Sequence, residues 1–410
     1  MTEPVTKIAI LYPADPLGKV IGGIETFIRG LIKFSPQDVE YTLFGATTDN
    51  VARPVGRDTF CELGDRSFIY HPIICQNDVG RQTRLPITVR YEAAAIFRMP
   101  SLSDFHVLES HRIEHFLLRG GKVPLNLFMH QNMASLKNKQ SDIRWRHSPG
   151  LYYWLERQVL NRSASIFCVR EDAVQNYRER HPDIADRIHF VPTWMDPNVF
   201  YPVIDSKRVK LRSALISAFG INPDKTIMVA VGRLDHQKNP LLLLNAMSKV
   251  IIQWPDIHLI WVGEGNLREV VETTAKNLGL SDCITLAGLK SPDEIADIHR
   301  AADLFVMSSA YEGMPIAVSE ALACGLPVAS TRVGEIARLV KPGVNGELCE
   351  TQSSEKLGDA IAASLQHLEA YKGKPCIEAA SQYIPQQVLL PLYDSYRQTR
   401  RTNNSGGSVL

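Results

Sequence analysis

Residues 303–327 read DLFVMSSAYEGMPIAVSEALACGLP, and this stretch decides the fold that we expect for the chain. The apolar run at 303–307 is typical of a buried parallel strand. A turn through Glu312 follows, and then a short helix at 316–323 with Pro315 in a first-turn position. A strand that leads through a turn into a helix is the building unit of an α/β sheet.

Two carboxylates in this stretch, Glu312 and Glu320, could carry chemistry. Glu312 lies in the predicted turn, where its side chain can face a ligand, and Glu320 lies on the predicted helix. The free backbone N–H groups at the helix start favour an anion. Together these groups could bind a charged sugar nucleotide. A surface loop with two solvated glutamates explains the same residue types equally well.

The composition is that of a globular protein and excludes several other classes. The 410 residues leave room for two domains, and 45% hydrophobic and 22% charged residues are ordinary values. A net charge of +1 argues against a dedicated nucleic-acid binder. Seven scattered cysteines without a C-x-x-C pair indicate a reducing compartment and no structural zinc site. No apolar run has the length of a signal peptide or a membrane span, so we expect a cytoplasmic protein.

Strand-like and helix-like segments alternate in both halves, which predicts two doubly wound, mostly parallel sheets. In the first half, strands are expected at 7–12, 39–45, 67–74, 105–108, 124–129, 165–169 and 187–191, with helices at 24–34, 151–161 and 172–180. In the second half, strands are expected at 226–231, 258–262, 284–287, 303–307, 327–330 and 346–349, with helices at 240–253, 267–278, 292–300, 316–323 and 354–367.

Proline and asparagine interrupt this alternation near residue 197, where we place the domain boundary. We therefore expect a Rossmann-like domain over 1–197 and a second one over 198–383. A closing helix is predicted at 384–400, and the tail 401–410 is predicted to be disordered. Ligands bind such sheets at the carboxyl ends of the strands, so the loops that follow strands should hold the chemistry.

Basic residues follow the first predicted strand of the second half. The sequence VAVGRLDHQK supplies Arg233 and, five residues later, Lys238. A planar guanidinium and a compact ammonium could neutralise a diphosphate leaving group, although a solvated basic turn has the same composition. The next strand ends in VGEG, but Arg268 stands where a dinucleotide fingerprint needs its third glycine. No P-loop motif occurs either.

Three loops of the first half also carry candidate residues. Gly22 and Gly23 precede a predicted helix, where paired glycines allow close approach of a phosphate but are also common turn chemistry. His130 follows a predicted strand and could exchange a proton or bind a sugar hydroxyl, although a lone loop histidine is more often structural. The spacing of His111 and His115 lacks the glutamate of H-E-x-x-H, and no D-x-D occurs, so we expect no metal site.

Residues 81–170 hold 14 Lys/Arg against 6 Asp/Glu, a net charge of +8. Within this window, basic residues alternate with aromatic ones: Lys137, Lys139, Arg144, Trp145 and Arg146, followed by Tyr152, Tyr153 and Trp154. This pattern suits an anionic membrane face or a phosphate-bearing acceptor. A solvated helix whose aromatic side chains belong to the core is the simpler explanation.

Taken together, these loops resemble the retaining nucleotide-sugar glycosyltransferases of family 4, the group 1 transferases with the GT-B fold. The second half carries VGRLDHQKNP, WVGEGNLREV, ITLAGL, ADLFVMSSAYEGMPIAVSEALACGLPVAST and GVNGELCE in family order. In the first half GGIE, LFMHQN and YYWLERQVLNRSASIFCV are similar but weaker, and the resemblance covers nearly the whole chain. It implies two Rossmann-like domains facing each other across a cleft, with a C-terminal helix crossing back to the N-terminal domain.

The resemblance also implies roles for individual residues. Glu312 matches the first glutamate of the E-x7-E motif, which contacts the transferred sugar, and Glu320 matches the second, which holds the ribose. Arg233 and Lys238 would bind the diphosphate, and His130 resembles the N-domain active-site histidine. Further donor contacts would come from Gly22, Gly23, Gly313, Met314, Pro315 and Ile316, with the base held by backbone near Leu286 to Leu289.

The sequence departs from the family pattern at two places. Thr193 and Trp194 stand where an asparagine-glycine pair usually precedes the interdomain aspartate, and Arg170 replaces a serine. We expect neither departure to touch the donor site, so both bear on the acceptor side.

The reaction we expect is hexosyl transfer from a UDP- or GDP-sugar to an acceptor hydroxyl, with retention, no cofactor and no metal. A lipid-linked glycan or polysaccharide precursor of bacterial cell-surface glycan synthesis would be the acceptor, with peripheral contact at the inner face of the membrane. A sugar-nucleotide epimerase and an inactive nucleotide-sugar-binding protein are the alternatives. The combination of Glu312, Lys238, Arg233 and His130 favours transfer over both.

Overall fold

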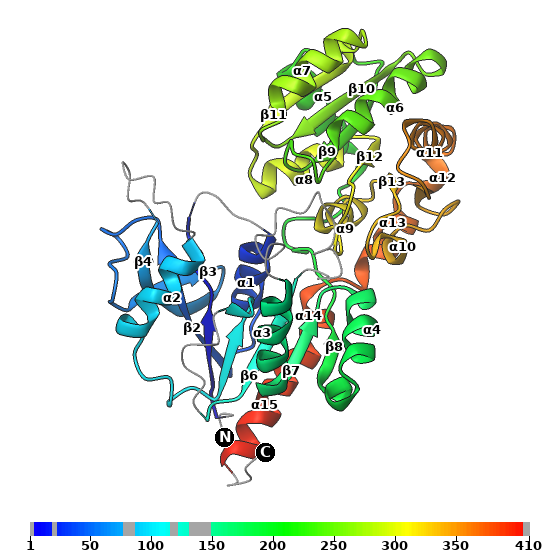
Figure 1. Cartoon of the computed structure of the whole chain (residues 1–410). Helices are drawn as coiled ribbons and strands as arrows, with labels where there is room; N and C mark the ends of the chain where they lie inside the picture. Colours follow the sequence, from blue (N-terminus) through cyan, green and yellow to red (C-terminus); the bar gives the residue numbers. More distant parts are fainter. Residues whose placement is uncertain (1–3, 19–22, 77–86, 115–121, 131–148, 405–410) are drawn as a thin grey trace. The chain divides into compact units, whose positions relative to one another are not determined.

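The computed structural model describes residues 4–18, 23–76, 87–114, 122–130 and 149–404. The chain divides into two compact units. One comprises Met1–Pro192 together with Val388–Leu410, and the other comprises Thr193–Gln387. The division therefore falls a few residues before the predicted boundary at 197, and the return to the first unit a few residues after 383 (Figure 1).

The first unit is built on an eight-stranded sheet in the order β3-β4-β2-β1-β5-β6-β7-β8. Its strands are β1 (Thr6–Leu11), β2 (Val39–Thr47), β3 (Thr59–Leu63), β4 (Arg66–Cys75), β5 (Val107–Ser110), β6 (Leu125–Met129), β7 (Ser163–Cys168) and β8 (Ile188–Phe190). All neighbours run parallel except β3 and β4. The predicted parallel sheet is confirmed, and the edge strand β3 is an addition to it.

The helices of the first unit follow its strands in the expected alternation. They are α1 (Gly23–Lys33), α2 (Ile87–Arg98), α3 (Pro149–Arg162), α4 (Glu171–Arg180), the 3-10 turn η4 (Pro182–Arg187) and α15 (Leu390–Asn404). Helix α2 was not predicted from the sequence. It buries only Tyr91 and Ala95, one turn apart, which is too narrow a stripe for apolar periodicity to reveal.

The C-terminal helix α15 belongs to the first unit, as predicted (Figure 1). The guanidinium of Arg397 donates two hydrogen bonds of 2.7 Å to Asp38, and Tyr393 donates to the carbonyl of Leu31. The predicted single helix is in fact two, because α14 (Pro385–Val388) ends before α15 begins. The disordered tail was also predicted too early: the helix continues to Asn404, and Thr402 Oγ1 donates to the carbonyl of Gln398.

The second unit contains a six-stranded, wholly parallel sheet in the order β11-β10-β9-β12-β13-β14. The strands are β9 (Thr226–Val231), β10 (Ile257–Val262), β11 (Ile284–Gly288), β12 (Leu304–Met307), β13 (Val328–Thr331) and β14 (Gly346–Cys349). Each lies within two residues of its predicted bounds. Counted along the chain the order is 3-2-1-4-5-6, that of a dinucleotide-binding Rossmann sheet.

Helices cover both faces of this second sheet. They are α5 (Asp205–Phe219), α6 (Pro240–Gln253), α7 (Arg268–Asn277), the 3-10 turn η5 (Ser281–Cys283), α8 (Pro292–Ala301), α9 (Ile316–Ala323), α10 (Ile336–Leu339), α11 (Ser354–Gln366), α12 (Leu368–Tyr371), α13 (Lys374–Ser381) and α14. Alternate residues of β9 enter two different apolar clusters, with Ile227 and Val229 in one and Met228 and Ala230 in the other. Since successive side chains of a strand point to opposite faces, these clusters are the two cores of a three-layer sandwich.

The strand order reverses between β9 and β12, where Phe305 pairs with Val229. At this switch point, the loops after the two strands lead to α6 and α9 on different sides, and ligands of open α/β sheets bind there. Among the described residues, no helix combines the length and the apolar character that crossing a bilayer requires.

Candidate active site

The loops at the switch point of the second unit bring Lys238 and Glu312 together. Lys238 precedes α6, and Glu312 lies in the turn between β12 and α9. The ammonium Nζ of Lys238 donates to Glu312 Oε1 at 2.7 Å, with 20% and 9% of the respective side chains exposed. Two residues 74 positions apart, both predicted as site residues, therefore form a partly buried ion pair.

Hydrogen bonds to backbone carbonyls hold these two loops to each other. The hydroxyl of Ser308 donates to the carbonyls of Lys238 and Asn239, at 2.9 and 3.0 Å. The N–H of Ala310 donates to the carbonyl of Gln237 at 2.8 Å. Asn239 has a φ of 47°, a left-handed conformation that asparagine tolerates better than most residues. The loops are thus fixed by their backbones, and this fixes the position from which Lys238 reaches Glu312.

Gly232 makes room for the Lys238 side chain. A Cβ atom at Gly232 would lie 3.0 Å from Cε of Lys238, and the Gly232 carbonyl accepts a hydrogen bond of 2.9 Å from the buried Trp261 indole. Arg233 follows at once but is not brought to Glu312. Its guanidinium contacts Asp235 at 2.9 Å, and 70% of its side chain is exposed. The structure therefore separates the two predicted diphosphate ligands into an enclosed lysine and a solvent-facing arginine.

The predicted donor turn, Gly313 to Ile316, leads directly into α9. The carbonyl of Gly313 accepts from the N–H of Glu335 at 2.9 Å. Pro315 was predicted in the first turn of the helix, whereas it has extended backbone and occupies the cap position, with Ile316 as the first helical residue. Met314 is buried, so it can offer a ligand its backbone but little side chain.

The expectation that Thr193 does not touch the donor site is wrong. Its hydroxyl donates to the carbonyl of Met314 at 3.1 Å. One of the two departures from the family pattern therefore contacts the predicted donor turn, although we expected it to bear on the acceptor side alone. Sequence reasoning missed the contact because 121 residues separate the partners.

Glu320 lies on α9, partly buried, and its carboxylate makes no hydrogen bond within the described part of the chain. Burial, together with the smaller effect of the nearby Asp196 charge, raises the pKa of this carboxyl to about 7. A carboxylate held without a partner at this position can accept hydrogen bonds from vicinal hydroxyl groups, because each of its oxygens has two free lone pairs.

The raised pKa of Glu320 predicts an unusual pH dependence of stability. The folded state binds this proton more tightly than the unfolded chain, whose pKa is 4.5, so stability falls as pH rises from about 4.5 to about 7. Glu320→Gln should therefore be more stable than the wild type at pH 8, by about 1–3 kcal/mol, and equal to it at pH 4.

Urea unfolding at both pH values measures the difference. Glu378→Gln on the surface of α13 is the control, and its stability should follow the wild type at both. Equal effects of Glu320→Gln at pH 4 and pH 8 would contradict the assigned pKa.

The residues predicted to lie beside the base, Leu286 and Leu289, sit at the end of β11. Leu286 is partly buried within the strand, and Leu289 follows it and is 78% exposed. The neighbouring carbonyl of Gly288 accepts from the N–H of Gly263 at 2.8 Å. Leu286 therefore stands on the edge strand of the sheet, with β10 between it and β9, and Leu289 directly follows that strand.

In the first unit, His130 directly follows β6 and meets a second histidine. Nε2 of His130 lies 2.8 Å from Nδ1 of His111, and Nε2 of His111 lies 2.9 Å from Glu109 Oε1. The strand predicted at 105–108 stops short of Glu109, which lies inside β5 and is fully buried. Burial lowers the pKa of His130 well below its usual range, and His111 and Arg112 lower it further. His130 is thus a neutral imidazole at neutral pH.

Not all of the predicted residues lie in the described part of the chain. Gly23 is the exposed first residue of α1, whereas Gly22 lies outside the described residues. The same holds for His115 and for the basic group Lys137, Lys139, Arg144, Trp145 and Arg146. In the described ranges, no three His, Cys, Asp or Glu side chains gather where they could hold a metal ion.

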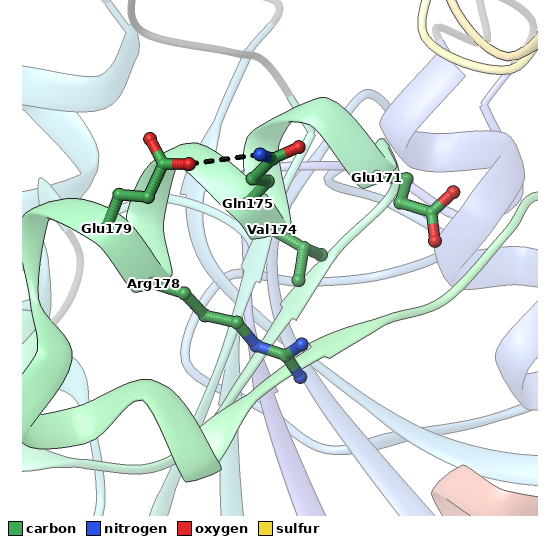
Figure 2. Close-up of a pocket in the computed structure, with 5 residues that line it drawn as sticks. All are labelled: Glu171, Val174, Gln175, Arg178 and Glu179. Carbon is green, nitrogen blue, oxygen red and sulfur yellow. Dashed lines mark hydrogen bonds between the residues drawn. The ribbon is translucent and has the colours of Figure 1, made fainter.

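A surface hollow on α4 involves none of the predicted residues. Figure 2 shows its lining, which comprises Glu171, Val174, Gln175, Arg178 and Glu179. Gln175 donates to Glu179 at 3.0 Å, and Arg178 donates to the carbonyls of Ala185 and Ile188. Because the guanidinium already binds backbone oxygens, Arg178 ties α4 to β8, and we assign it a structural role.

Part of the sequence matches a known protein family. Residues 212–378 match the family described as glycosyl transferases group 1. A D-inositol 3-phosphate glycosyltransferase of Segniliparus rotundus is 30% identical over 221 residues, which cover 52% of this chain and 48% of that protein. The chain thus spans about half the length of the curated relatives it matches.

Solved structures show the same fold over nearly the whole chain. Sucrose-phosphate synthase from Thermosynechococcus elongatus superposes with a TM-score of 0.76 at 20% identity, covering 96% of this chain and 98% of that one. Anabaena Alr3699/HepE in complex with UDP and glucose gives a TM-score of 0.69 at 16% identity, covering 96% and 100%. Residues 212–378 are therefore similar to the group 1 glycosyltransferases, and the chain has the GT-B fold of these solved structures.

Proposed function

We propose that this chain is a retaining hexosyltransferase that moves a sugar from a nucleoside diphosphate sugar to an acceptor hydroxyl. The observation that carries the proposal is the Lys238–Glu312 pair at the switch point of the second sheet. The pair sets a cation and a carboxylate beside each other where such folds bind ligands. The Anabaena relative holds UDP and glucose, which supports a nucleotide-sugar donor for this chain as well.

The proposed chemistry is the departure of a diphosphate. As the bond between sugar and phosphate breaks, negative charge grows on the leaving oxygens and positive charge grows on the sugar ring. Lys238 would neutralise the first charge, and the carboxylate of Glu312 would stabilise the second. Arg233, exposed in the structure, would join the phosphates when a donor is present. His130 would hydrogen-bond the sugar, and Glu320 would hold the ribose hydroxyls. No metal is required by this scheme.

A panel of donors tests the proposal. The protein is incubated with UDP-, GDP- and ADP-sugars, and thermal shift and sugar release are measured with and without EDTA. We expect one nucleotide to raise the melting temperature, because a ligand of the native state stabilises it, and its sugar to be released or transferred. Nucleotide binding without turnover of any donor would refute the enzymatic function.

For the acceptor, we propose a lipid-linked glycan or polysaccharide precursor at an anionic membrane. Residues 81–170 carry a net charge of +8 from 14 Lys/Arg and 6 Asp/Glu. Two helices in this window expose large apolar side chains, since Phe97 on α2 is 87% exposed and Trp154 on α3 is 58% exposed. Exposed aromatic residues in a basic surrounding are typical of proteins that lie on a membrane.

Liposome sedimentation measures this association. The wild type should sediment with anionic liposomes at low salt, and binding should fall at high salt because ions screen the attraction. Phe97→Glu and Trp154→Glu should each weaken binding several-fold. Ile252→Glu, at an 84% exposed position on α6 of the second unit, is the control and should bind like the wild type. No sedimentation with anionic liposomes would exclude a membrane-bound acceptor.

A further inference from the structure

A chain of hydrogen bonds runs from the C-terminal helix to His130 through the first unit. The hydroxyl of Tyr396 on α15 donates to Glu109 Oε2 at 2.6 Å, across 287 positions of sequence. Glu109 Oε1 contacts Nε2 of His111, and Nδ1 of His111 contacts Nε2 of His130. In the described part of the chain, Nδ1 of His130 has no hydrogen-bond partner. The chain of contacts therefore ends at a ring nitrogen that can serve a ligand.

The geometry points to Glu109, His111 and Tyr396 as positioning residues that decide which ring nitrogen of His130 carries the proton. When Glu109 is protonated, its O–H donates to Nε2 of His111, the N–H at Nδ1 of His111 donates to Nε2 of His130, and the outer Nδ1 of His130 carries a proton. When Glu109 is ionised, each of these hydrogen bonds reverses its direction. Nε2 of His130 is then the protonated nitrogen, and its outer Nδ1 is an acceptor.

The two states, with Glu109 protonated and with Glu109 ionised, differ by one proton. The Glu109 proton passes to His111 Nε2, the His111 Nδ1 proton passes to His130 Nε2, and the proton on His130 Nδ1 leaves the protein. When the buried Glu109 carboxyl ionises, the proton that leaves the protein is therefore the one on Nδ1 of His130. Throughout, the Tyr396 hydroxyl donates to Glu109.

The surroundings hold the rings in the positions that this relay requires. His111 stacks on Phe128 with 4.8 Å between the ring centroids, and Phe27 and His130 make a T-shaped contact with 5.0 Å between theirs. Tyr41 on β2 and Tyr393 on α15 face the Glu109 carboxyl, and Arg112 stands near His130. Burial, partly offset by the Tyr396 hydrogen bond, raises the pKa of Glu109 to about 8. The protonated carboxyl, and with it a donor at His130 Nδ1, prevails at neutral pH.

Ring ¹⁵N resonances of His130, assigned with a His130→Gln variant, test the relay in the full-length protein. In the wild type, Nδ1 should change from pyrrole-type to pyridine-type as pH rises from about 6 to about 10, with a midpoint near 8. Glu109→Gln should abolish this transition, because an amide cannot ionise. Tyr396→Phe, the milder change, should move the midpoint to higher pH, because the ionised carboxylate loses a donor.

A matched control separates the relay from general damage. Tyr177→Phe also removes a buried tyrosine hydroxyl from a buried glutamate, Glu156, and should leave the His130 transition unchanged. The inference is overturned if Glu109→Gln keeps the wild-type transition, or if Tyr396→Phe leaves its midpoint in place.

The use of the relay in catalysis rests on the proposed function of His130, and a kinetic assay tests this part separately. Glu109→Gln should lower kcat by about 10–100-fold, as the loss of a partner that orients a metal-bound histidine does, with little change in the donor KM. A transition abolished in Glu109→Gln without any loss of kcat would leave the relay intact and contradict the catalytic role of His130.

Discussion

Lys238→Ala is expected to lower kcat for glycosyl transfer by about 10²–10³-fold, the usual cost of removing one group that stabilises developing charge. The structure gives this lysine little freedom, since Gly232 accommodates its side chain and Glu312 receives its ammonium at 2.7 Å. An ammonium set in place before the reaction needs no reorganisation when the diphosphate departs. Initial rates against donor concentration measure the effect.

Lys225→Ala provides a control of equal exposure. The Lys225 side chain is 21% exposed and Lys238 is 20% exposed, and each contacts a carboxylate of the same unit. Lys225 stands at the amino end of β9, away from the loops of the switch point. Its removal should leave the rate unchanged, so equal losses in both variants would show that a general charge or stability effect is being measured.

Arg233→Ala provides a second comparison for Lys238→Ala. Because 70% of its side chain is exposed and it contacts Asp235, Arg233→Ala should change unfolding free energy by less than about 1 kcal/mol. Its effect on transfer should appear mainly as a higher donor KM. The two variants together therefore separate a lysine that is positioned in advance from an arginine that must move to its ligand.

The parts of the fold that apolar periodicity governs could be predicted from the sequence, and α5 shows where this signal ends. Among the side chains of α5, only Leu215 is buried. The helix is held instead by Arg208 and Arg212, which donate to the carboxylate of Asp303 and to the carbonyls around it. Asp303 was predicted as a strand residue, yet its carboxylate also receives the N–H of Ile227 at 2.9 Å. A helix held by hydrogen bonds and ion pairs in this way leaves no periodic pattern of apolar residues in the sequence.

Some residues of the candidate site could likewise be predicted from the sequence, and others could not. Glu312, Lys238 and His130 could be found because each lies in a loop that follows a strand, where parallel sheets bind their ligands. The residues that set the position and protonation of these side chains could not be predicted, because they lie far away along the chain. Tyr396 reaches Glu109 from a helix beyond the second unit, and nothing in the local sequence marks a tyrosine as the partner of a buried acid.

Gly334→Ala should destabilise the second unit by about 3–5 kcal/mol, the range of the severe backbone and packing effects. Gly334 has a φ of +53°, and a Cβ atom there would lie 1.9 Å from the carbonyl oxygen of Gly313 and 2.5 Å from that of Glu312. Both neighbours are backbone atoms of the predicted donor turn, so no side chain can swing away to relieve the clash. The turn itself must move.

Gly343→Ala isolates the conformational part of this cost. Gly343 also has a positive φ, +76°, but a Cβ atom there meets no atom within 4 Å apart from its chain neighbours. Gly343→Ala should therefore lower the unfolding free energy only by the cost of placing alanine in the left-handed region, about 1–2 kcal/mol. Chemical unfolding compares the two variants, and donor affinity in the folded protein should fall for Gly334→Ala alone. If both variants lose the same stability and both keep the wild-type donor affinity, the close packing of residue 334 against the Glu312 turn does not support the site.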